Sequence, residues 1–581
     1  MTQPQRGDSI VQTRVRTESF PQLTDPLFGN LALSAVCAAL PLLLLFVLLG
    51  VFRVKAHKAA LAGLALSILL AIVIWRMPVG QTFSAAVEGA FYGLFPILWI
   101  LINALWIYKL TVATRWFEVL GRAIRSISND LRILAILIAF CFGALLESLA
   151  GFGAPVAISA AMLMAAGMKP LTSAIVSLLA NTAPVAFGAM AAPIIALNGV
   201  TGLAVHDLSR MLGRQTPFIA VLVPLILVFI VDGRRGLRQT WPVAVVAGIV
   251  FALAQFFTSN FFAMELTDVV AAVSTVIAVL VMLRFWQPAK IVGLSPETVP
   301  DGVGPMHADG SRERSVPAPV VLDATVRGAT VDRPPRRQVL LSIAPYLIIM
   351  AIFSIAQIPA IKAWLGVVGT VTFQWPGLDV ADAAGGPVPA QTFRLDHVKA
   401  TGTLLFFSGL LTMVLYRISI REGLGIYRAN LVQLRWTIVT VTAVLALSFV
   451  MNLSGQTNTL GVALATTGGF FVILSPVLGW IGVALTGSDT SSNSLFGQLQ
   501  VTAAAKTGLS PLLMAAANSS AGVLGKMLSL QNLAVAAAAV GIAGSEGILF
   551  RKLIGWSLGL LVVIATLILL QSMPILGWMV P

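Results

Sequence analysis

Three charged side chains lie inside apolar sequence, where a charge needs a partner or a function. Glu147 follows Gly-Ala-Leu-Leu, Asp489 lies in the polar stretch TGSDTSSN, and Lys526 lies in the stretch ANSSAGVLGKM. A charged group near the middle of a bilayer costs about 2.5–3.5 kcal/mol on insertion scales. A carboxyl group there is suited to reversible proton binding, or it is a fixed carboxylate that accepts hydrogen bonds. We therefore expect proton coupling by Glu147 or Asp489. Lys526 could pair with a substrate carboxylate, neutralise Asp489, or snorkel to the cytoplasmic interface.

Small polar residues and glycines interrupt four of the apolar stretches. The interruptions read ESLAGFGAP, NTAPVAFGAM, TGSDTSSN and NSSAGVLGKM, at 147–155, 181–190, 486–493 and 518–527. Such breaks are tolerated at membrane depth only when they are buried in protein or line a cavity. A helix that begins after a break also points its positive end at the break, which favours an anion. The alternative is a structural kink with polar packing between helices. The residues expected to bind a small anionic ligand are Gly151, Gly153, Asn181, Thr182, Ser488, Thr490, Ser491, Ser492, Asn493, Asn518, Ser519, Ser520 and Lys526.

The composition indicates which class of protein must position these groups. Of the 581 residues, 58% are hydrophobic and only 10% are charged, against about 25% charged in a typical soluble domain. This excludes a soluble globular protein, a disordered chain and, despite the net charge of +14, a nucleic-acid binder. The sequence contains no HExxH, CxxC, Walker A, GxGxxG or GxSxG motif. We therefore expect an all-α polytopic membrane protein with no enzymatic activity, no bound metal and no cofactor.

Apolar stretches of about 20 residues mark the membrane crossings, and we expect about 12 crossings plus two re-entrant hairpins. Clusters of Lys and Arg fall on one side if both hairpins return to their starting side, and the positive-inside rule makes that side cytoplasmic. Both termini are then periplasmic. The predicted divisions are a polar tail at 1–29, a first repeat at 30–231 with a hairpin at 131–167 and a broken helix at 171–197, two connecting helices at 232–286, a basic cytoplasmic linker at 287–338, and a second repeat at 339–581 with a hairpin at 459–507 and a broken helix at 510–548.

An internal repeat relates the two halves. GMKPL at 167–171 matches GLSPL at 508–512, and NTAPVAFGAM matches NSSAGVLGKM. A polar, helix-breaking stretch precedes each GxxPL sequence. Because the first hairpin is expected to start inside and the second outside, the halves are inverted relative to one another. Inverted repeats with broken helices are typical of secondary transporters, whose binding sites lie where the breaks meet.

Other acidic residues have simpler interpretations. Glu88 begins an apolar span, where an interfacial position explains it. Glu265 and Asp268 are expected to be solvated loop ends.

The motif blocks resemble the lactate permease family, which also includes glycolate permeases. The matching stretches are FCFGALLESLAGFGAPVAISAAML, GMKPL, NTAPVAFGAMAAPI, LTGSDTSSNSLFGQLQ, ANSSAGVLGKM and LQNLAVAAAAVG, together with the early WRMPVG and AFYGLFPILWI. The likeness covers nearly the whole chain except 287–337 and 358–400. It implies a bacterial inner-membrane protein that takes up L-lactate, D-lactate or glycolate together with a proton.

Two other functions remain open from the residues alone. A sodium-coupled carboxylate symporter would use similar Ser-, Asn- and Thr-rich breaks, and an anion channel would conduct without accumulating its substrate. The expected partners are a small monocarboxylate and the lipid bilayer, and the sequence leaves the oligomeric state open.

Overall fold

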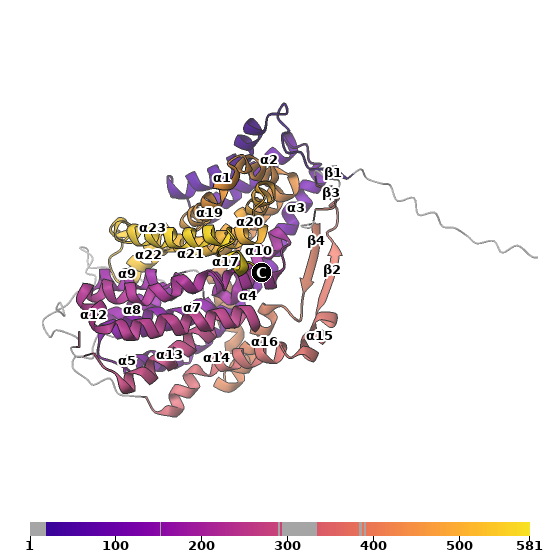
Figure 1. The fold of residues 1–581 in the computed structure, drawn as a ribbon. Helices are drawn as coiled ribbons and strands as arrows, with labels where there is room; N and C mark the ends of the chain where they lie inside the picture. The colour runs from indigo at the N-terminus through magenta and orange to yellow at the C-terminus, as the bar shows by residue number, and fades with distance from the viewer. Residues whose placement is uncertain (1–18, 151–152, 289–290, 293–333, 383–385, 389–390) are drawn as a thin grey trace, which may run out of the picture.

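The computed structural model describes residues 19–150, 153–288, 291–292, 334–382, 386–388 and 391–581. Most of the predicted tail 1–29 and linker 287–338, and also Gly151, lie outside the described residues. The described part is mostly helical, as predicted (Figure 1). It contains ten helices that are long and apolar enough to cross a membrane, or twelve if each of two bent pairs is one span.

The first half begins with a short strand and continues with a series of helices. Their bounds are β1 Phe20–Pro21, α1 Leu31–Gly50, α2 Ala56–Val73, α3 Val79–Tyr92, η1 Gly93–Leu98, α4 Trp99–Ala113, α5 Trp116–Arg125, α6 Leu131–Leu134, η2 Ala135–Phe142, α7 Gly143–Ala150, α8 Ala154–Ala165, α9 Pro170–Ala180, η3 Val185–Phe187, α10 Gly188–Thr201, α11 Val205–Leu212, α12 Thr216–Phe261, η4 Met264–Leu266 and α13 Thr267–Phe285.

The second half is a further series of helices with three short strands after its first two helices. Their bounds are α14 Arg336–Ala356, α15 Pro359–Val368, β2 Thr370–Gln374, β3 Val380–Ala381, β4 Thr392–Asp396, α16 Thr401–Tyr416, α17 Ile420–Ser454, α18 Gln456–Ala465, η6 Gly468–Phe470, α19 Phe471–Thr486, α20 Asp489–Thr507, α21 Pro511–Gly525, η7 Lys526–Leu528, α22 Leu530–Ala539, α23 Glu546–Gln571 and η8 Gly577–Met579.

Glycines with positive φ produce the sharp reversals between helices. Gly153, at φ 84°, precedes α8, which has a proline in its first turn. Gly487, at φ 75°, ends α19, and the side chain of Ser488 then caps α20 by accepting from the amide of Ser491. Glycine suits the left-handed conformation, and serine suits the cap, because each satisfies the backbone at a helix end. Both reversals are therefore encoded locally.

The long helix α12 is two antiparallel arms. Its helical conformation is interrupted at Asp232 and Gly233, where Gly233 has φ 61°. The two arms then pack so closely that a Cβ atom on Gly248 would lie 2.6 Å from the carbonyl oxygen of Val221. The first arm runs toward the turn at Asp232, and the second arm returns to the side from which the first started.

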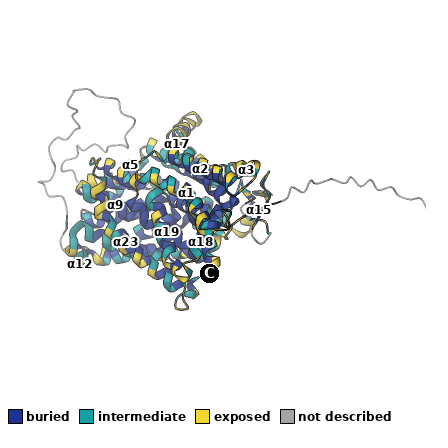
Figure 2. Ribbon diagram, turned by 90° about the horizontal axis from the view of Figure 1, so that it is seen from above, coloured by how far each residue is buried: buried dark blue, intermediate teal, exposed yellow. Residues whose placement is uncertain are grey.

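The two halves of the chain are interleaved. Helix α10 of the first half packs against α20 of the second, and α22 of the second half packs against α8 and α9 of the first. Figure 1 shows α21, α22 and α23 lying alongside α8, α9 and α12. Buried residues fill the interior, and exposed ones are concentrated on the periphery (Figure 2). Many of these peripheral residues are large and apolar, including Val36, Leu43 and Phe257, as expected of a surface that faces lipid.

The segment 358–400 forms local structure. Strands β2 and β4 pair antiparallel, and β3 pairs in parallel with β1 near the start of the chain. The β2–β4 ribbon lies along one side of the helices (Figure 1). These strands are too short for their periodicity to stand out, and β1 and β3 are paired across more than half of the sequence.

Candidate functional site

A buried ion pair joins the two halves at their centre. Lys526 Nζ, at the start of η7, lies 2.6 Å from Glu147 Oε1 on α7, and the side chains are 6% and 3% exposed. Asn181, at the C-terminal end of α9, donates to Glu147 Oε2 at 2.9 Å. Both oxygens of Glu147 therefore have donors. Three separate elements converge on one carboxylate, as they do when a charge must be buried.

Asp489 forms a second polar cluster at the start of α20. Its Oδ2 accepts from Ser519 Oγ at 2.5 Å and from Asn493 Nδ2 at 3.5 Å. Its Oδ1 has no hydrogen-bond partner among the residues that the structure describes. Beside it, Asn518 Nδ2 donates to Asn493 Oδ1 at 2.9 Å. The cluster links the tip helix α20 to the helix α21.

A single cavity connects the two clusters. Its volume is about 30 Å³, close to the share of one water molecule in the liquid. The cavity is therefore too small in this conformation for a ligand of several non-hydrogen atoms. It is lined by residues from α7, η3, α10, the turn before α20, the first turn of α20, and η7, namely Glu147, Val185, Gly188, Ala189, Pro193, Gly487, Ser488, Asp489, Thr490 and Lys526.

The start of α10 has an unusual backbone that brings it close to Glu147. Ala189, Met190 and Ala191 all have left-handed φ values, of 45°, 52° and 61°. For residues other than glycine this conformation costs about 1–2 kcal/mol each. A Cβ atom on the preceding Gly188 would lie 2.9 Å from Glu147 Oε1. Strain of this kind is concentrated at functional sites, and here it lies on the cavity wall.

The other predicted ligand-binding hydroxyls and amides are distributed unevenly. Thr182 and Ser520 donate to backbone carbonyls three residues earlier in the chain, and Ser488 caps α20. Thr490 lines the cavity, and Ser491 lies next to it in the first turn of α20. Ser492 Oγ donates to Gly479 O at 3.5 Å, in the helix contact rather than in the cavity.

The first hairpin tip touches the second broken helix. A Cβ atom on Gly153 would lie 3.0 Å from Asn532 Oδ1 on α22, whose Nδ2 donates to the carbonyl of Lys526. Asn532 was not predicted as a site residue, although the string LQNLAVAAAAVG contains it. Gly151, the neighbouring predicted residue, lies outside the described residues.

Two predictions about acidic residues were wrong. Glu88 was expected at an interface and Asp268 in a solvated loop end, yet both are 0% exposed. Helix α3 packs Glu88 into the interior against α17, and α7 and α12 cover the first turn of α13. Burial by elements distant in sequence cannot be read from local composition.

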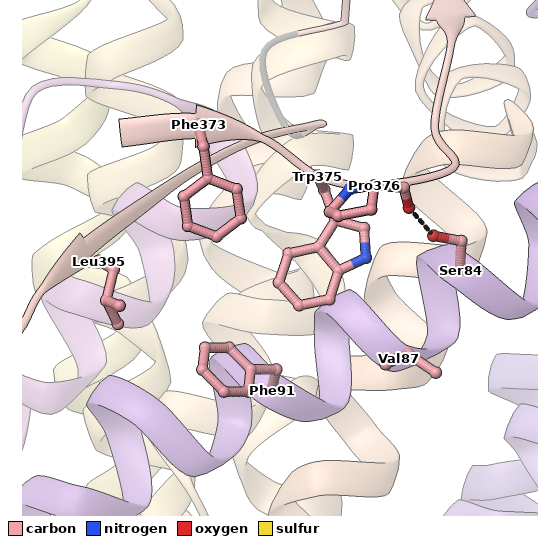
Figure 3. Close-up of a pocket in the computed structure, with 7 residues that line it drawn as sticks. All are labelled: Ser84, Val87, Phe91, Phe373, Trp375, Pro376 and Leu395. Carbon is pink, nitrogen blue, oxygen red and sulfur yellow. Dashed lines mark hydrogen bonds between the residues drawn. The ribbon is translucent and has the colours of Figure 1, made fainter. Parts of the chain in front are cut away.

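A larger cavity, of about 450 Å³, lies between α3 and the β2–β4 ribbon. Ser84 Oγ donates to Pro376 O at 2.6 Å on its rim. Figure 3 shows Phe91, Phe373 and Trp375 gathered around it. The other lining residues are Val87 and Leu395. With one hydroxyl and no charged group, this lining is not suited to a small anion.

Known proteins resemble this chain over almost its full length. A family model described as L-lactate permease matches residues 34–575. Glycolate permease GlcA of Escherichia coli K12 is 41% identical over 95% of this chain and 98% of its own length. The L-lactate permease of Bacillus subtilis 168 is 39% identical over 96% of this chain and 99% of its own length. A solved YdaH transporter from Alcanivorax borkumensis covers 83% of this chain and 86% of its own at 13% identity and a TM-score of 0.39, which supports no further conclusion. With its apolar helices and these relatives, this multi-pass membrane protein belongs to the L-lactate permease family.

Proposed function

We propose that this protein is a secondary active transporter that imports a short 2-hydroxy monocarboxylate together with one proton across the bacterial inner membrane. L-lactate is the first substrate to test, followed by D-lactate and glycolate, because relatives at 39–41% identity carry the names L-lactate permease and glycolate permease. The single observation that carries the mechanism is the Lys526–Glu147 ion pair on the cavity wall.

The ion pair supplies a reason for coupling the anion to a proton. An incoming carboxylate is attracted to Lys526, the cation on the cavity wall among the described residues. When it takes Lys526 from Glu147, the Glu147 carboxylate loses its counter-charge and is left with the Asn181 amide. An unpaired buried charge costs several kcal/mol. Binding a proton to Glu147 removes that cost, so anion and proton enter together and the net charge of the site is unchanged.

Asp489 is the alternative proton carrier in this proposal. It lies on the same cavity and has one oxygen without a hydrogen-bond partner among the described residues. Its other oxygen accepts from Ser519 and Asn493. Thr490 and the first-turn amides of α20 are placed to receive the substrate's hydroxyl and carboxylate groups.

We further propose that the two halves are inverted repeats around this site. The order of hairpin arms α7 and α8 followed by the broken helix α9–α10 matches that of α19 and α20 followed by α21–α22. The broken pairs bend by 60° and 44°. The distribution of Lys and Arg supports the opposite orientation of the two halves. It also supports a cytoplasmic position for the basic clusters and a periplasmic position for both termini.

The cavity must widen to receive its substrate. Lactate has six non-hydrogen atoms, and the present volume of about 30 Å³ suits one water molecule. Movement of the tips at Gly153 and Gly487 against the α10 and η7 segments would open it. The described conformation is therefore proposed to be one that is too narrow to hold the substrate.

The test is uptake of labelled L-lactate into proteoliposomes under an imposed inward proton gradient without sodium. We expect uphill accumulation that a protonophore abolishes. Accumulation only after sodium is added would replace the proton with sodium as the coupling ion. Equilibration without accumulation under either gradient would indicate a channel. Absence of any L-lactate, D-lactate or glycolate uptake by folded protein would refute the substrate class.

A further inference from the structure

Asp268 is a buried acid with few hydrogen-bond donors around it among the described residues. It lies in the first turn of α13 and is 0% exposed. No donor meets either carboxylate oxygen at ordinary hydrogen-bond geometry among the residues that the structure describes, and only a weaker interaction with the Gln255 side chain is present. The Gln255 side chain is its polar neighbour, and Glu147 and Lys526 are close enough for their charges to act on it. Helix α13 also packs directly against α7, which carries Glu147.

A structural role explains this environment poorly. Buried acids that stabilise a fold are normally saturated with donors, as Asp130 is. That residue is 1% exposed and pairs with Arg132 at 2.7 Å. An ionised carboxylate without such donors costs several kcal/mol to bury. This environment therefore favours the protonated form of Asp268, and the residue is a place where a proton can reside.

A line of buried polar groups connects the neighbourhood of Asp268 to a partly exposed arginine. Gln255, Ser259 and Asn260 share one face of the second arm of α12. Arg214 Nε donates to Asn260 Oδ1 at 3.0 Å, and Asn260 Nδ2 donates to Ser259 Oγ at 3.2 Å. Ser259 Oγ in turn donates to the carbonyl of Gln255 at 2.7 Å. An otherwise apolar helix thus carries a polar stripe that leads inward from the surface.

The inner end of this line reaches the ion-pair site. Gln255 Nε2 donates to Ala183 O at 3.3 Å, and Thr216 Oγ1 holds Gln255 Oε1 at 3.1 Å. Ala183 lies in the break of the first broken helix, two residues after Asn181, which donates to Glu147. The stripe therefore ends beside the residue that must gain a proton when substrate binds.

We propose that Asp268 is a second proton-binding residue of the transport cycle, lying between the surface at Arg214 and Glu147. This proposal rests on the proposed proton symport. The proton on Asp268 passes to the Glu147 carboxylate when a substrate carboxylate takes Lys526. Water that enters along Asn260, Ser259 and Gln255 then returns a proton to the Asp268 carboxylate. One proton is lost and one gained at each residue, so the balance closes at one proton for each substrate.

The groups that face Asp268 are consistent with this role. Helix α7 contributes Glu147, and η7 contributes Lys526 at longer range. From η4, Glu265 is directed toward Thr401, Lys362 and Lys399 instead. The titratable group of η2 is the thiol of Cys141. The charged residues of α12 are clustered around the turn at Asp232 and Gly233, at the other end of the second arm from Gln255.

The test compares Asp268→Asn with a matched control, Glu265→Gln, which neutralises an acid three residues earlier. Two assays on the same proteoliposomes separate the roles. The first is exchange of labelled for unlabelled L-lactate at equal pH, in which Glu147 stays protonated and no relay is needed. The second is accumulation under an inward gradient of one pH unit, which supports at most about tenfold accumulation at one proton per substrate.

We expect Asp268→Asn to retain exchange and lose accumulation, and the pH profile of its uptake to flatten, while Glu265→Gln behaves as the wild type. Accumulation by Asp268→Asn at the wild-type level would refute the role of Asp268 and leave the proposed proton symport intact. Loss of both exchange and accumulation in folded Asp268→Asn protein would show a structural role and refute it as well. If Asp268→Asn does not fold, Gln255→Leu takes its place, because it removes the hydrogen bond from Gln255 to Ala183 O. Retained exchange with lost accumulation would again support the proposal, and either wild-type accumulation or loss of both activities would refute it. Wild-type protein that exchanges but never accumulates under the proton gradient would instead refute proton symport itself, and with it the relay.

Discussion

Removing Lys526 alone should destabilise the protein more than removing both members of the Glu147–Lys526 pair. At 2.6 Å and an effective dielectric constant of about 20, the attraction is about 6 kcal/mol. Desolvation of both groups offsets part of it, and breaking a buried pair from one side costs about 3–5 kcal/mol. Each 1.4 kcal/mol is about tenfold, so Lys526→Met should raise the unfolding equilibrium constant by roughly a hundredfold or more. Glu147→Gln should cost less, because its amide oxygen can still accept from Lys526.

The assay is thermal unfolding of detergent-purified variants, followed by tryptophan fluorescence, with Lys506→Met as the control. Lys506 is an exposed lysine in the last turn of α20. We expect Lys526→Met to have the lowest midpoint, and the double variant Glu147→Gln/Lys526→Met to recover part of the loss, since two matched neutral groups bury no unpaired charge. Transport should be absent from both, because the substrate carboxylate has lost its cation.

Two results would refute this reasoning. Equal midpoints for Lys526→Met and Lys506→Met would mean that the pair does not form in the folded protein. A double variant whose loss equals the sum of the single losses would mean that the two side chains do not interact, since independent sites add.

Three further changes test the walls of the site. Gly188→Ala places a methyl group 2.9 Å from Glu147 Oε1; we expect transport to fall at least about tenfold for a displacement costing about 1.4 kcal/mol, and unchanged uptake would contradict the geometry. Ser519→Ala removes the 2.5 Å donor to Asp489 and should lower stability by about 1–3 kcal/mol, measured as a lower unfolding midpoint than that of the wild type. Ala191→Gly, at φ 61°, relieves about 1–2 kcal/mol of strain against about 0.5–1 kcal/mol of added chain entropy, so its midpoint should rise; a fall would show that the left-handed turn is not strained.

The breaks in the helices were largely readable from the sequence. Gly153 followed by a proline, and Gly487 followed by a serine cap, are local signals for ending one helix and starting another. The positions of Glu147, Asp489 and Lys526 in apolar sequence marked them for the same reason, because a charge in such a setting is costly. Their partners were not readable: the sequence left Lys526 open to pairing with Asp489, whereas its nearest carboxylate is that of Glu147.

The misassigned residues show where local reasoning ends. Asp268 follows a short loop and begins a helix, which is the pattern of an ordinary solvated helix start. Only the packing of α7 and α12 over that turn makes it a buried acid. The left-handed turn at Ala189–Ala191 likewise has no signal in residue type, because alanine and methionine both favour helix.

The sequence by itself determined a polytopic helical membrane protein, the positions of its helix breaks and the charged residues worth testing, because these depend on hydrophobicity, helix-ending residues and the cost of a lone charge. The tertiary structure decided which charges meet. Glu147 and Lys526 are 379 positions apart, and their contact exists only because α7 and η7 are brought together by the interleaving of the two halves. A pairing of that range follows from packing, which no local pattern encodes.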